Sequence, residues 1–368
     1  MVTLIGMGSG RWEALSAQAQ AAVRSAGLVF GAKRLLAGLP ADCAARQFAL
    51  YQPADILEIL AQAPGQDAAV LYSGDTGFYS GASGLLTPLR ALGIPARVYP
   101  GISSIQLLAA ALGRPWQDWK LVSAHGCACD PVAQCMTERS VFFLTGGAET
   151  PAILCRKLAD AGMGEAHGVV GENLGTEAEA IRYGSAAELA GQSFAPLSVL
   201  LVENFSLPPL RTPGWPDEAF LRGEVPMTKQ EVRAAALAKL AVTPADTIWD
   251  VGAGTGSVSV ELALAAPKGR VYAVECAPDA CALIRKNRAK FQAYNLTLIE
   301  GRAPEALADL PALDAVFIGG TKGGMEGVLD AVLAKKPGAR ICIAHGKKTE
   351  EQISSVWQQL LDNEIDIL

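Results

Sequence analysis

A glycine-rich stretch behind an apolar run constrains the fold of this chain more than any other feature. The stretch DVGAGTGSVSVELA begins at Asp250 and carries Gly252, Gly254 and Gly256 at alternate positions. A strand, a tight glycine turn and a helix in this order open a parallel βαβ unit. Further strand-like segments alternate with helical stretches and predict a five-stranded, doubly wound α/β sheet: DTIWDVG, RVYAVE, LTLIEG, DAVFIGG and ARICIA.

The residues around the glycines narrow the ligand of this loop. A dinucleotide fingerprint has a third glycine where Ser257 stands, and a Walker loop needs a lysine directly after Gly256. Glu275, at the end of RVYAVE, is placed to accept hydrogen bonds from two ribose hydroxyls. A ribose-binding acid beside a loop without a phosphate-binding lysine favours S-adenosylmethionine over NAD or ATP.

The N-terminal part of the chain shows the same alternation of strands and helices. Its strand-like runs predict parallel βαβ units: VTLIG, LVFG, AAVLYSGD, ARVYPG and KLVSAHG. The pattern restarts near Val141 with VFFLTGG, GVVGENLG and LSVLLVEN, which predicts a second, smaller α/β unit ending near Asn204. The loop LIGMGSG also follows a strand, but the next apolar run ends in Gly31, Lys33 and Arg34 and offers no acid for a ribose. A repeat of the C-terminal site is therefore not expected here.

Chain length and proline content predict the domain organisation. At about 150 residues per domain, 368 residues correspond to two or three domains. The segment FSLPPLRTPGWPDEAFLRGEVP has five prolines and little periodicity, as linkers do. Thr228 is expected to cap the following helix, with Glu231 completing a capping box. The predicted parts are a first domain 1–206 with lobes 1–118 and 119–206, a linker 207–224 and a second domain 225–368.

Charge and composition favour a small-molecule substrate. The net charge is −6 and no run of Lys and Arg stands out, which argues against nucleic acid or an anionic membrane as partner. No stretch reaches the roughly 18 apolar residues of a membrane helix, and the N-terminus lacks the features of a signal peptide. We therefore expect a cytoplasmic protein.

The eight cysteines are too sparse and irregular for a disulfide scaffold, so free thiols are expected. One cluster, AHGCACDPVAQC, brings together His125, Cys127, Cys129 and Cys135. Its spacing lacks the paired CxxC arms of zinc sites. We interpret it as a loop with buried thiols and expect no metal, with a metal site as the alternative.

Four C-terminal motifs in this order resemble a family of methyltransferases: PMTKQEVR, DVGAGTGSVSVE, EGRAPEAL and FIGGTKGG. The loop and Glu275 are similar to class I methyltransferases in general, and the full set resembles the cobalamin-pathway enzymes that methylate carbon 15 of a precorrin and remove the ring C acetate carboxyl. Small residues at Gly319, Gly320 and Thr321 leave room for a bulky substrate with a carbon nucleophile. The resemblance implies these cofactor-binding residues: Thr228, Gly252, Ala253, Gly254, Thr255, Gly256, Glu275 and Ala303.

Six N-terminal motifs resemble the class III tetrapyrrole methylases, and among them the enzymes that methylate carbon 5 of a precorrin: LIGMGSG, GAKRLL, YSGDTGFYSGA, YPGISSIQLLAAALG, VSAHG and ENLGTEAEAI. In that family S-adenosylmethionine lies folded between two α/β lobes. For Asp75 the alternative is that its side chain only forms the local turn. The resemblance implies these cofactor-binding residues: Ser9, Ser73, Gly74, Asp75, Phe78, Ser103 and Ser104.

Basic residues near these turns fit a substrate with many carboxylates, because Arg pairs with them bidentately and Lys acts as a point charge. For each, a solvated surface charge is the alternative. No Ser/His/Asp arrangement is visible, and positioning of the reactants in a dry pocket can supply much of the rate of methyl transfer. The candidate substrate-binding residues are Lys33, Arg34, Arg114, Lys229 and Arg233.

Together the two resemblances imply an S-adenosylmethionine-dependent C-methyltransferase with two cofactor sites, which is expected to methylate precorrin-6B at carbons 5 and 15 and to decarboxylate it. We expect a homo-oligomer. Alternatives are the cobalt-containing version of the substrate and a corrin carrier or sensor without turnover. After Ala344 the sequence departs from the family, and EIDIL is expected to supply only the first strand of the hairpin that normally ends a class I sheet.

Overall fold

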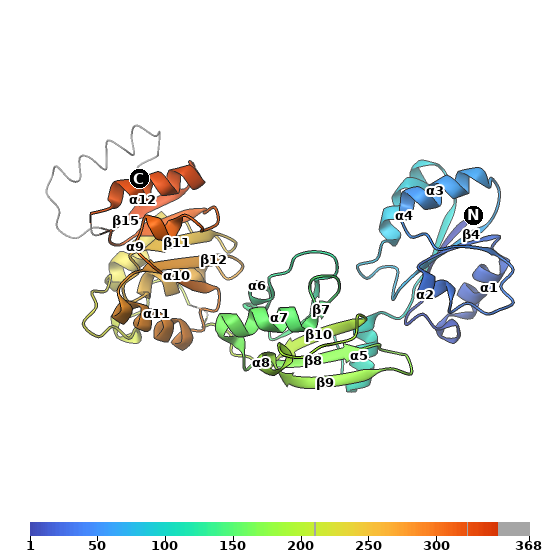
Figure 1. The fold of residues 1–368 in the computed structure, drawn as a ribbon, viewed down its shortest axis with the longest axis horizontal. Helices are drawn as coiled ribbons and strands as arrows, with labels where there is room; N and C mark the ends of the chain where they lie inside the picture. Colours follow the sequence, from blue (N-terminus) through green and yellow to red (C-terminus); the bar gives the residue numbers. More distant parts are fainter. Residues whose placement is uncertain (210, 322, 345–368) are drawn as a thin grey trace.

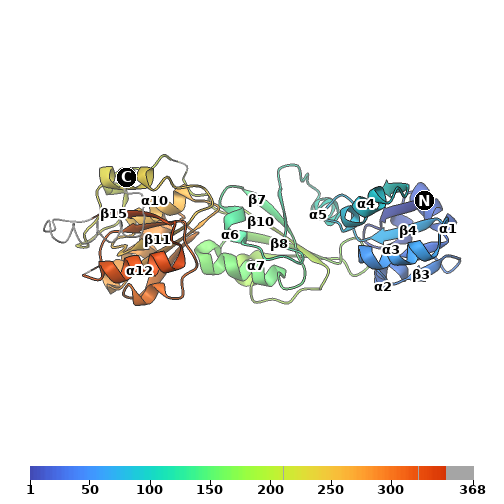
Figure 2. The same cartoon turned by 90° about the horizontal axis from the view of Figure 1, so that it is seen from above.

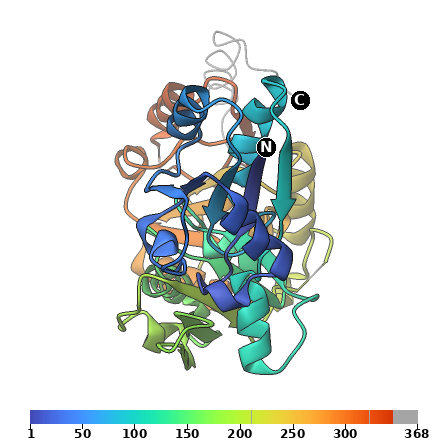
Figure 3. The ribbon, with the colours of Figure 1, turned by 90° about the vertical axis from the view of Figure 1, so that its right-hand side faces the viewer.

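The computed structural model describes residues 1–209, 211–321 and 323–344. Three α/β bodies follow one another along the long axis of the molecule, in chain order (Figures 1 and 2). Seen along that axis, the first body lies in front of the other two (Figure 3). Each body is built around one five-stranded sheet. The predicted strand EIDIL lies outside the described residues.

The first lobe is an all-parallel sheet with the strand order β3-β2-β4-β1-β5. Helices cover both faces of this sheet, so its inner strands are continuous apolar runs. One hydrophobic core forms on each face of the sheet. The predicted strands VTLIG, LVFG, AAVLYSGD and ARVYPG form this sheet, whereas KLVSAHG supplies β6 of the second lobe and the short strand β3 was not predicted. The elements are β1 (Val2–Gly6), α1 (Ala17–Ser25), β2 (Leu28–Phe30), α2 (Lys33–Leu36), β3 (Arg46–Phe48), α3 (Pro53–Gln62), β4 (Ala68–Tyr72), α4 (Ala82–Ala91) and β5 (Ala96–Tyr99), with a 3-10 turn η1 (Trp12–Ala14).

The second lobe has a mixed sheet with the strand order β6-β7-β10-β8-β9. Only β6 and β7 pair in parallel, and the other neighbours are antiparallel. The elements are α5 (Ser104–Leu112), β6 (Lys120–Ser123), α6 (Pro131–Cys135), β7 (Ser140–Leu144), α7 (Pro151–Leu158), a π-helical turn η2 (Ala159–Met163), β8 (His167–Glu172), β9 (Ala180–Ser185), α8 (Ala186–Leu189) and β10 (Ser198–Glu203).

The boundary between the lobes lies before α5, not near residue 118 as predicted. Ile105 and Leu108 of α5 are fully buried against Val169 and Leu201 of the second sheet. Figure 1 shows α5 beside β8 and β10. The prediction was wrong because a helix that follows a strand is expected to return to the same sheet, whereas α5 crosses to the next one.

The C-terminal domain confirms the predicted doubly wound sheet. Its five strands are all parallel, in the order β13-β12-β11-β14-β15, and each face carries its own core. The elements are η3 (Asp217–Ala219), α9 (Gln230–Lys239), β11 (Thr247–Val251), α10 (Ser257–Ala265), β12 (Arg270–Glu275), α11 (Pro278–Lys290), β13 (Leu296–Glu300), η4 (Glu305–Leu307), β14 (Ala315–Ile318), α12 (Met325–Lys335) and β15 (Arg340–Ile343).

Two predictions next to this domain are corrected. The second half of the expected linker belongs to the domain, because Phe220 is buried in its core and Trp215 packs against it. Thr228 does not cap α9: the N-cap position is held by Lys229, whose side chain makes no capping hydrogen bond. Among the described residues, no helix is long and apolar enough to cross a membrane.

Side chains of the second lobe and the C-terminal domain contact each other, and Tyr294 packs against the core of the second lobe. Arg270, at the start of β12, donates to both carboxylate oxygens of Asp130 at 2.9 and 2.6 Å. Asp130 also caps α6, so the same side chain serves the helix and the interface. Nearby, Arg288 donates to the Ala161 carbonyl at 2.6 Å.

Candidate functional site

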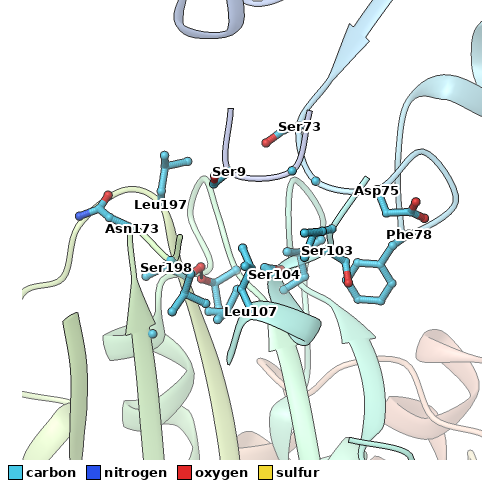
Figure 4. A pocket seen from close by; sticks show the side chains of 18 of the residues that line it. Ser9, Ser73, Asp75, Phe78, Ser103, Ser104, Leu107, Asn173, Leu197 and Ser198 are labelled. Carbon is cyan, nitrogen blue, oxygen red and sulfur yellow. Dashed lines mark hydrogen bonds between the residues drawn. The ribbon is translucent and has the colours of Figure 1, made fainter. Parts of the chain in front are cut away.

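A cavity of about 430 Å³ lies between the first and second lobes. Figure 4 shows the loops of the first lobe, with Ser9 and Ser73, facing Ser104, Leu107 and Ser198 of the second lobe. The structure brings all the cofactor residues predicted for the N-terminal domain to this one cavity. They are Ser9, Ser73, Gly74, Asp75, Phe78, Ser103 and Ser104.

Close backbone packing of three glycines shapes the wall that the first lobe contributes. A Cβ atom on Gly6 would lie 2.5 Å from the Gly101 nitrogen and 2.7 Å from the Gly74 carbonyl oxygen. A Cβ atom on Gly101 would overlap the carbonyl oxygens of Gly74 and Gly6. The glycines that the sequence places after β1, β4 and β5 therefore let three loops meet at the carboxyl edge of the sheet.

Asp75 has the structural role that was considered as the alternative. Its Oδ2 accepts a hydrogen bond from the Gly77 amide at 2.7 Å, and its Oδ1 accepts one from the Gly101 amide at 3.0 Å. Both carboxylate oxygens are thus engaged by backbone of the first lobe. Asp75 lines the cavity and holds the two loops that carry Ser73 and Ser103.

The basic residues predicted near the cavity lie in different surroundings. Arg34 lines the cavity and donates to the Ser73 hydroxyl. Lys33 is exposed at the start of α2. Arg114 follows α5 and pairs with Glu203 at the end of β10, and it does not line the cavity. Of these three, Arg34 is the one that the structure brings to the site.

The second lobe contributes residues that the sequence did not reveal as site residues. Ser198 and Leu197 come from the start of β10, and Asn173 follows β8 with a positive φ of 47°. His125 stood in the quoted motif VSAHG but was considered only as part of the cysteine cluster. Asn173 likewise stood in the quoted motif ENLGTEAEAI but was not assigned to the site. Leu197 and Ser198 lay only in a strand-like run, and they reach the cavity when the two lobes are joined.

The cysteine cluster is a partly buried loop next to this wall. Cys127 is exposed, Cys129 is half-buried and Cys135 is buried. Burial, followed by the charge of Glu149, raises the pKa of the Cys129 thiol to about 11. Among the described residues, no group of three or more His, Cys, Asp and Glu side chains is arranged to hold a metal ion.

Tyr79 joins the two lobes at the rim of the cavity. Its hydroxyl donates to the Leu121 carbonyl of β6 at 3.1 Å, and its backbone has a φ of +47° in the left-handed region. This backbone conformation is strained for a residue other than glycine, so tertiary contacts must stabilise it. Phe78, the preceding residue, packs on Phe142 of the second lobe.

We expect Tyr79→Phe to weaken cofactor binding to the N-terminal domain severalfold. One uncharged hydrogen bond contributes about 0.5–1.5 kcal/mol, and here it holds the two walls together. Calorimetric titration with S-adenosylhomocysteine measures the effect. Tyr51→Phe, at an exposed first-lobe tyrosine outside the cavity, is the control. Equal affinities for both variants would contradict the role of the hydroxyl.

The C-terminal glycine loop lies at the carboxyl edge of the third sheet, between β11 and α10. Gly252, Gly254 and Gly256 all have positive φ values, of 75°, 56° and 75°. A Cβ atom on Gly252 would overlap the Gly320 carbonyl after β14, and one on Gly254 would lie 3.3 Å from the Pro226 carbonyl. The backbone path thus requires glycine, and the segment before Thr228 lies against the loop.

Glu275 ends β12 beside this loop and is almost fully buried. Its Oε2 accepts from the Gly254 amide at 2.9 Å, and its Oε1 accepts from the amides of Cys276 and Ala277 at 2.8 and 2.9 Å. A carboxylate has about four lone-pair positions, so capacity for a ribose hydroxyl remains. Ala303 follows β13 at the same edge of the sheet. The predicted arrangement of loop and acid is therefore present.

Two buried polar atoms at the loop find no hydrogen-bond partner within the described part of the chain: Oδ1 of Asp250 and Oγ1 of Thr255. Oδ2 of Asp250 accepts from the Ser259 hydroxyl. The pKa of Asp250 is raised to about 7, mainly by burial and to a smaller extent by the charge of Glu275, whereas the Ser259 hydrogen bond opposes the shift. Unpartnered polar atoms under a glycine cradle fit a polar ligand such as S-adenosylmethionine.

Asp250 should make the stability of the C-terminal domain depend on pH. Between about pH 4 and pH 7 the folded domain keeps a proton on Asp250 that the unfolded chain releases, so its contribution to stability is lost as pH rises through this range. We expect calorimetric unfolding scans of wild type to show a larger loss of Tm from pH 5 to pH 8 than scans of Asp250→Asn. The exposed Asp309→Asn variant is the control, and identical slopes for all three proteins would contradict the assignment.

Arg233 is a structural residue and not a substrate contact as predicted. Its side chain is fully buried, Nε donates to Glu261 at 2.8 Å and Nη1 donates to Asp217 at 2.8 Å. The guanidinium also donates to the carbonyls of Thr228 and Trp215. Lys229 is more than half exposed and lies 3.2 Å from Asp217.

Comparisons with known proteins agree with this two-part architecture. Residues 1–190 match the family model of tetrapyrrole (corrin/porphyrin) methylases, and residues 218–363 match that of the precorrin methyltransferase domain. A Sinorhizobium precorrin-6Y C(5,15)-methyltransferase (decarboxylating) is 33% identical over 92% of this chain and 83% of its own length.

Two shorter relatives cover part of the chain. A Salmonella typhimurium cobalt-precorrin-6B C(15)-methyltransferase (decarboxylating) is 46% identical over 34% of this chain and 65% of its own length. The solved structure of a Geobacter metallireducens precorrin-6y C5,15-methyltransferase is 40% identical, covers 42% of this chain and 80% of that one, and has a TM-score of 0.39. The chain matches the Sinorhizobium enzyme along nearly its whole length. It therefore belongs to the family of precorrin C(5,15)-methyltransferases (decarboxylating).

Proposed function

We propose that this chain methylates precorrin-6B at carbons 5 and 15 and removes the carboxyl group of the ring C acetate, giving precorrin-8 in cobalamin biosynthesis. The N-terminal domain acts on carbon 5, and the C-terminal domain acts on carbon 15 and decarboxylates. The observation that supports this most is the convergence of the predicted first-domain residues on one interlobe cavity, together with a separate glycine cradle that contacts Glu275.

S-Adenosylmethionine supplies the methyl group as a sulfonium ion at both sites. In the N-terminal domain, Ser9, Ser73 and Ser103 offer hydroxyls to the polar parts of the molecule, while Phe78 and Leu107 give the cavity apolar surface. In the C-terminal domain, the Gly252–Gly256 backbone and Glu275 hold the nucleoside. The protein positions the reactants and excludes water, which can account for a large part of the rate.

Arg34 is the strongest candidate for binding a substrate carboxylate at the first site. It lies on the cavity wall, its guanidinium has donors beyond the one used by Ser73, and burial lowers its pKa. Lys33 extends from the preceding position on the exposed side. The oligomeric state and the cytoplasmic location remain predictions.

The function is tested by incubating the full chain with methyl-¹³C S-adenosylmethionine and precorrin-6B. We expect a mass gain of two labelled methyl groups and loss of carbon dioxide, with ¹³C NMR placing the labels at carbons 5 and 15. A parallel reaction with the cobalt-containing substrate decides which form is used. Tight binding without any change of mass would contradict the proposal and indicate a carrier.

A further inference from the structure

The reaction at the first site must release a proton. When a methyl group from a sulfonium ion replaces hydrogen on a conjugated carbon, the donor becomes a neutral sulfide and the carbon loses its C–H proton. The residues that line the interlobe cavity include four with titratable side chains: Arg34, Asp75, Tyr79 and His125. Three of them are unsuited to accept this proton.

Arg34 is a permanent cation and has no acceptor. The oxygens of Asp75 accept hydrogen bonds from the backbone amides of Gly77 and Gly101, at 2.7 and 3.0 Å, and a proton on either oxygen would weaken the bonds that hold these two loops. The Tyr79 hydroxyl donates to a carbonyl across the lobes. Of these four residues, His125 therefore remains as the one whose side chain is suited to accept the proton.

The second lobe fixes both the tautomer and the position of the His125 ring. Nδ1 lies 3.1 Å from the Thr145 carbonyl oxygen, which can only accept, so Nδ1 carries the hydrogen and Nε2 of the neutral ring carries the lone pair. The Thr145 hydroxyl in turn donates to the Ser198 carbonyl at 2.6 Å. A Cβ atom on Gly146 would overlap the imidazole, so glycine there lets the ring lie against the backbone.

Few charges surround this imidazole. His125 is exposed on the cavity side, and no hydrogen bond to Nε2 is found among the described residues. Across the cavity stand Arg34 and Asp75, and on its own loop stands Cys127. The turn after Gly146 leads to Glu149, whose carboxylate is neutralised by Lys157 at 2.6 Å.

We propose that His125 is the general base of the carbon 5 methylation. An electron pair of the conjugated substrate forms the new bond to the methyl carbon, and the sulfur keeps the pair of the bond that breaks. The pair of the C–H bond then returns to the conjugated system, the proton moves to Nε2 of His125, and the imidazolium releases it to water. This inference rests on the proposed function of the first domain.

The decisive variant is His125→Asn in the full chain. An asparagine amide keeps a donor for the Thr145 carbonyl and removes the base at Nε2. We expect kcat for carbon 5 methylation to fall about 10²- to 10⁴-fold, the usual contribution of a general base. The Kd for S-adenosylhomocysteine should stay within about threefold, and methylation at carbon 15 in the same sample should be unchanged.

Two further measurements separate a base from a merely structural residue. The acid limb of the wild-type pH profile for carbon 5 should be absent from the residual activity of His125→Asn, and imidazole should partly restore the activity of His125→Ala. His167→Asn, at a histidine on β8 outside the cavity, is the control and should behave as wild type.

Full carbon 5 activity of His125→Asn, or a raised KM with unchanged kcat, would overturn the assignment of the base while leaving the proposed function intact. A wild-type chain that transfers no methyl group to carbon 5 would overturn the proposed function, and this inference with it.

Discussion

Replacing Gly252 by alanine should abolish carbon 15 methylation and decarboxylation while carbon 5 methylation continues. Gly252 has a φ of +75°, and an added Cβ atom would overlap the Gly320 carbonyl oxygen, which belongs to backbone and cannot move aside freely. The left-handed conformation alone costs an L residue about 1–2 kcal/mol. The loop must therefore shift away from Glu275, and the cofactor cradle is lost. The measurement is ¹³C NMR of the product formed from labelled methyl donor.

The reciprocal variant is Gly101→Ala in the first lobe. Its Cβ atom would overlap the carbonyl oxygens of Gly74 and Gly6, so we expect loss of carbon 5 methylation with carbon 15 chemistry retained. Gly338→Ala, where a Cβ atom would meet nothing within 4 Å, is the control for both. Loss of both activities in either variant would contradict two independent cofactor sites.

Arg233→Met should destabilise the C-terminal domain strongly without any specific effect on substrate affinity. The guanidinium is fully buried between Glu261 and Asp217, and it stacks on the Phe220 ring at 4.7 Å. Removing one partner of a buried ion pair costs about 3–5 kcal/mol, since the other charge is left without compensation. A loss of Tm of roughly 10–20 °C for this domain follows, measured by scanning calorimetry.

The ion pair is tested further by a second substitution. The double variant Arg233→Met with Glu261→Gln should recover part of the lost stability, because the unpaired carboxylate is removed. Lys229→Met is the control, since its exposed side chain makes a surface ion pair that contributes little. An unchanged Tm for Arg233→Met together with a raised substrate KM would instead support the predicted role of Arg233 as a substrate contact.

The pKa of Asp217 reports on the same contact. Burial alone would raise it, but the hydrogen bonds from Arg233 and Lys229 outweigh this effect and hold the pKa of Asp217 below its usual value. Asp217 lies in the segment that the proline pattern assigned to a linker. Arg233 thus ties this segment, through Asp217 and the Trp215 carbonyl, to the body of the domain.

The sequence alone determined most of the strands, the glycine turns at the carboxyl edges of the sheets and the position of Glu275 at the end of a strand beside the loop. These features are local: a parallel strand buried on both faces must be an apolar run, and a left-handed turn at its end selects glycine. The cofactor residues assigned to the first lobe came from the resemblance to the class III tetrapyrrole methylases, whose motifs lie at the turns after β1 and β4.

The tertiary structure alone decided how the lobes meet and which charges are buried. No local pattern shows that α5 leaves the first sheet for the second, or that Leu197 and Ser198 complete the cavity, because these contacts join segments far apart in sequence. A local pattern also does not show that Arg233 is buried and not solvated. Its burial depends on two carboxylates, of Asp217 and Glu261, that approach it only in the folded domain. The residue types at each turn specify its backbone conformation, whereas long-range packing specifies which other segments the turn contacts.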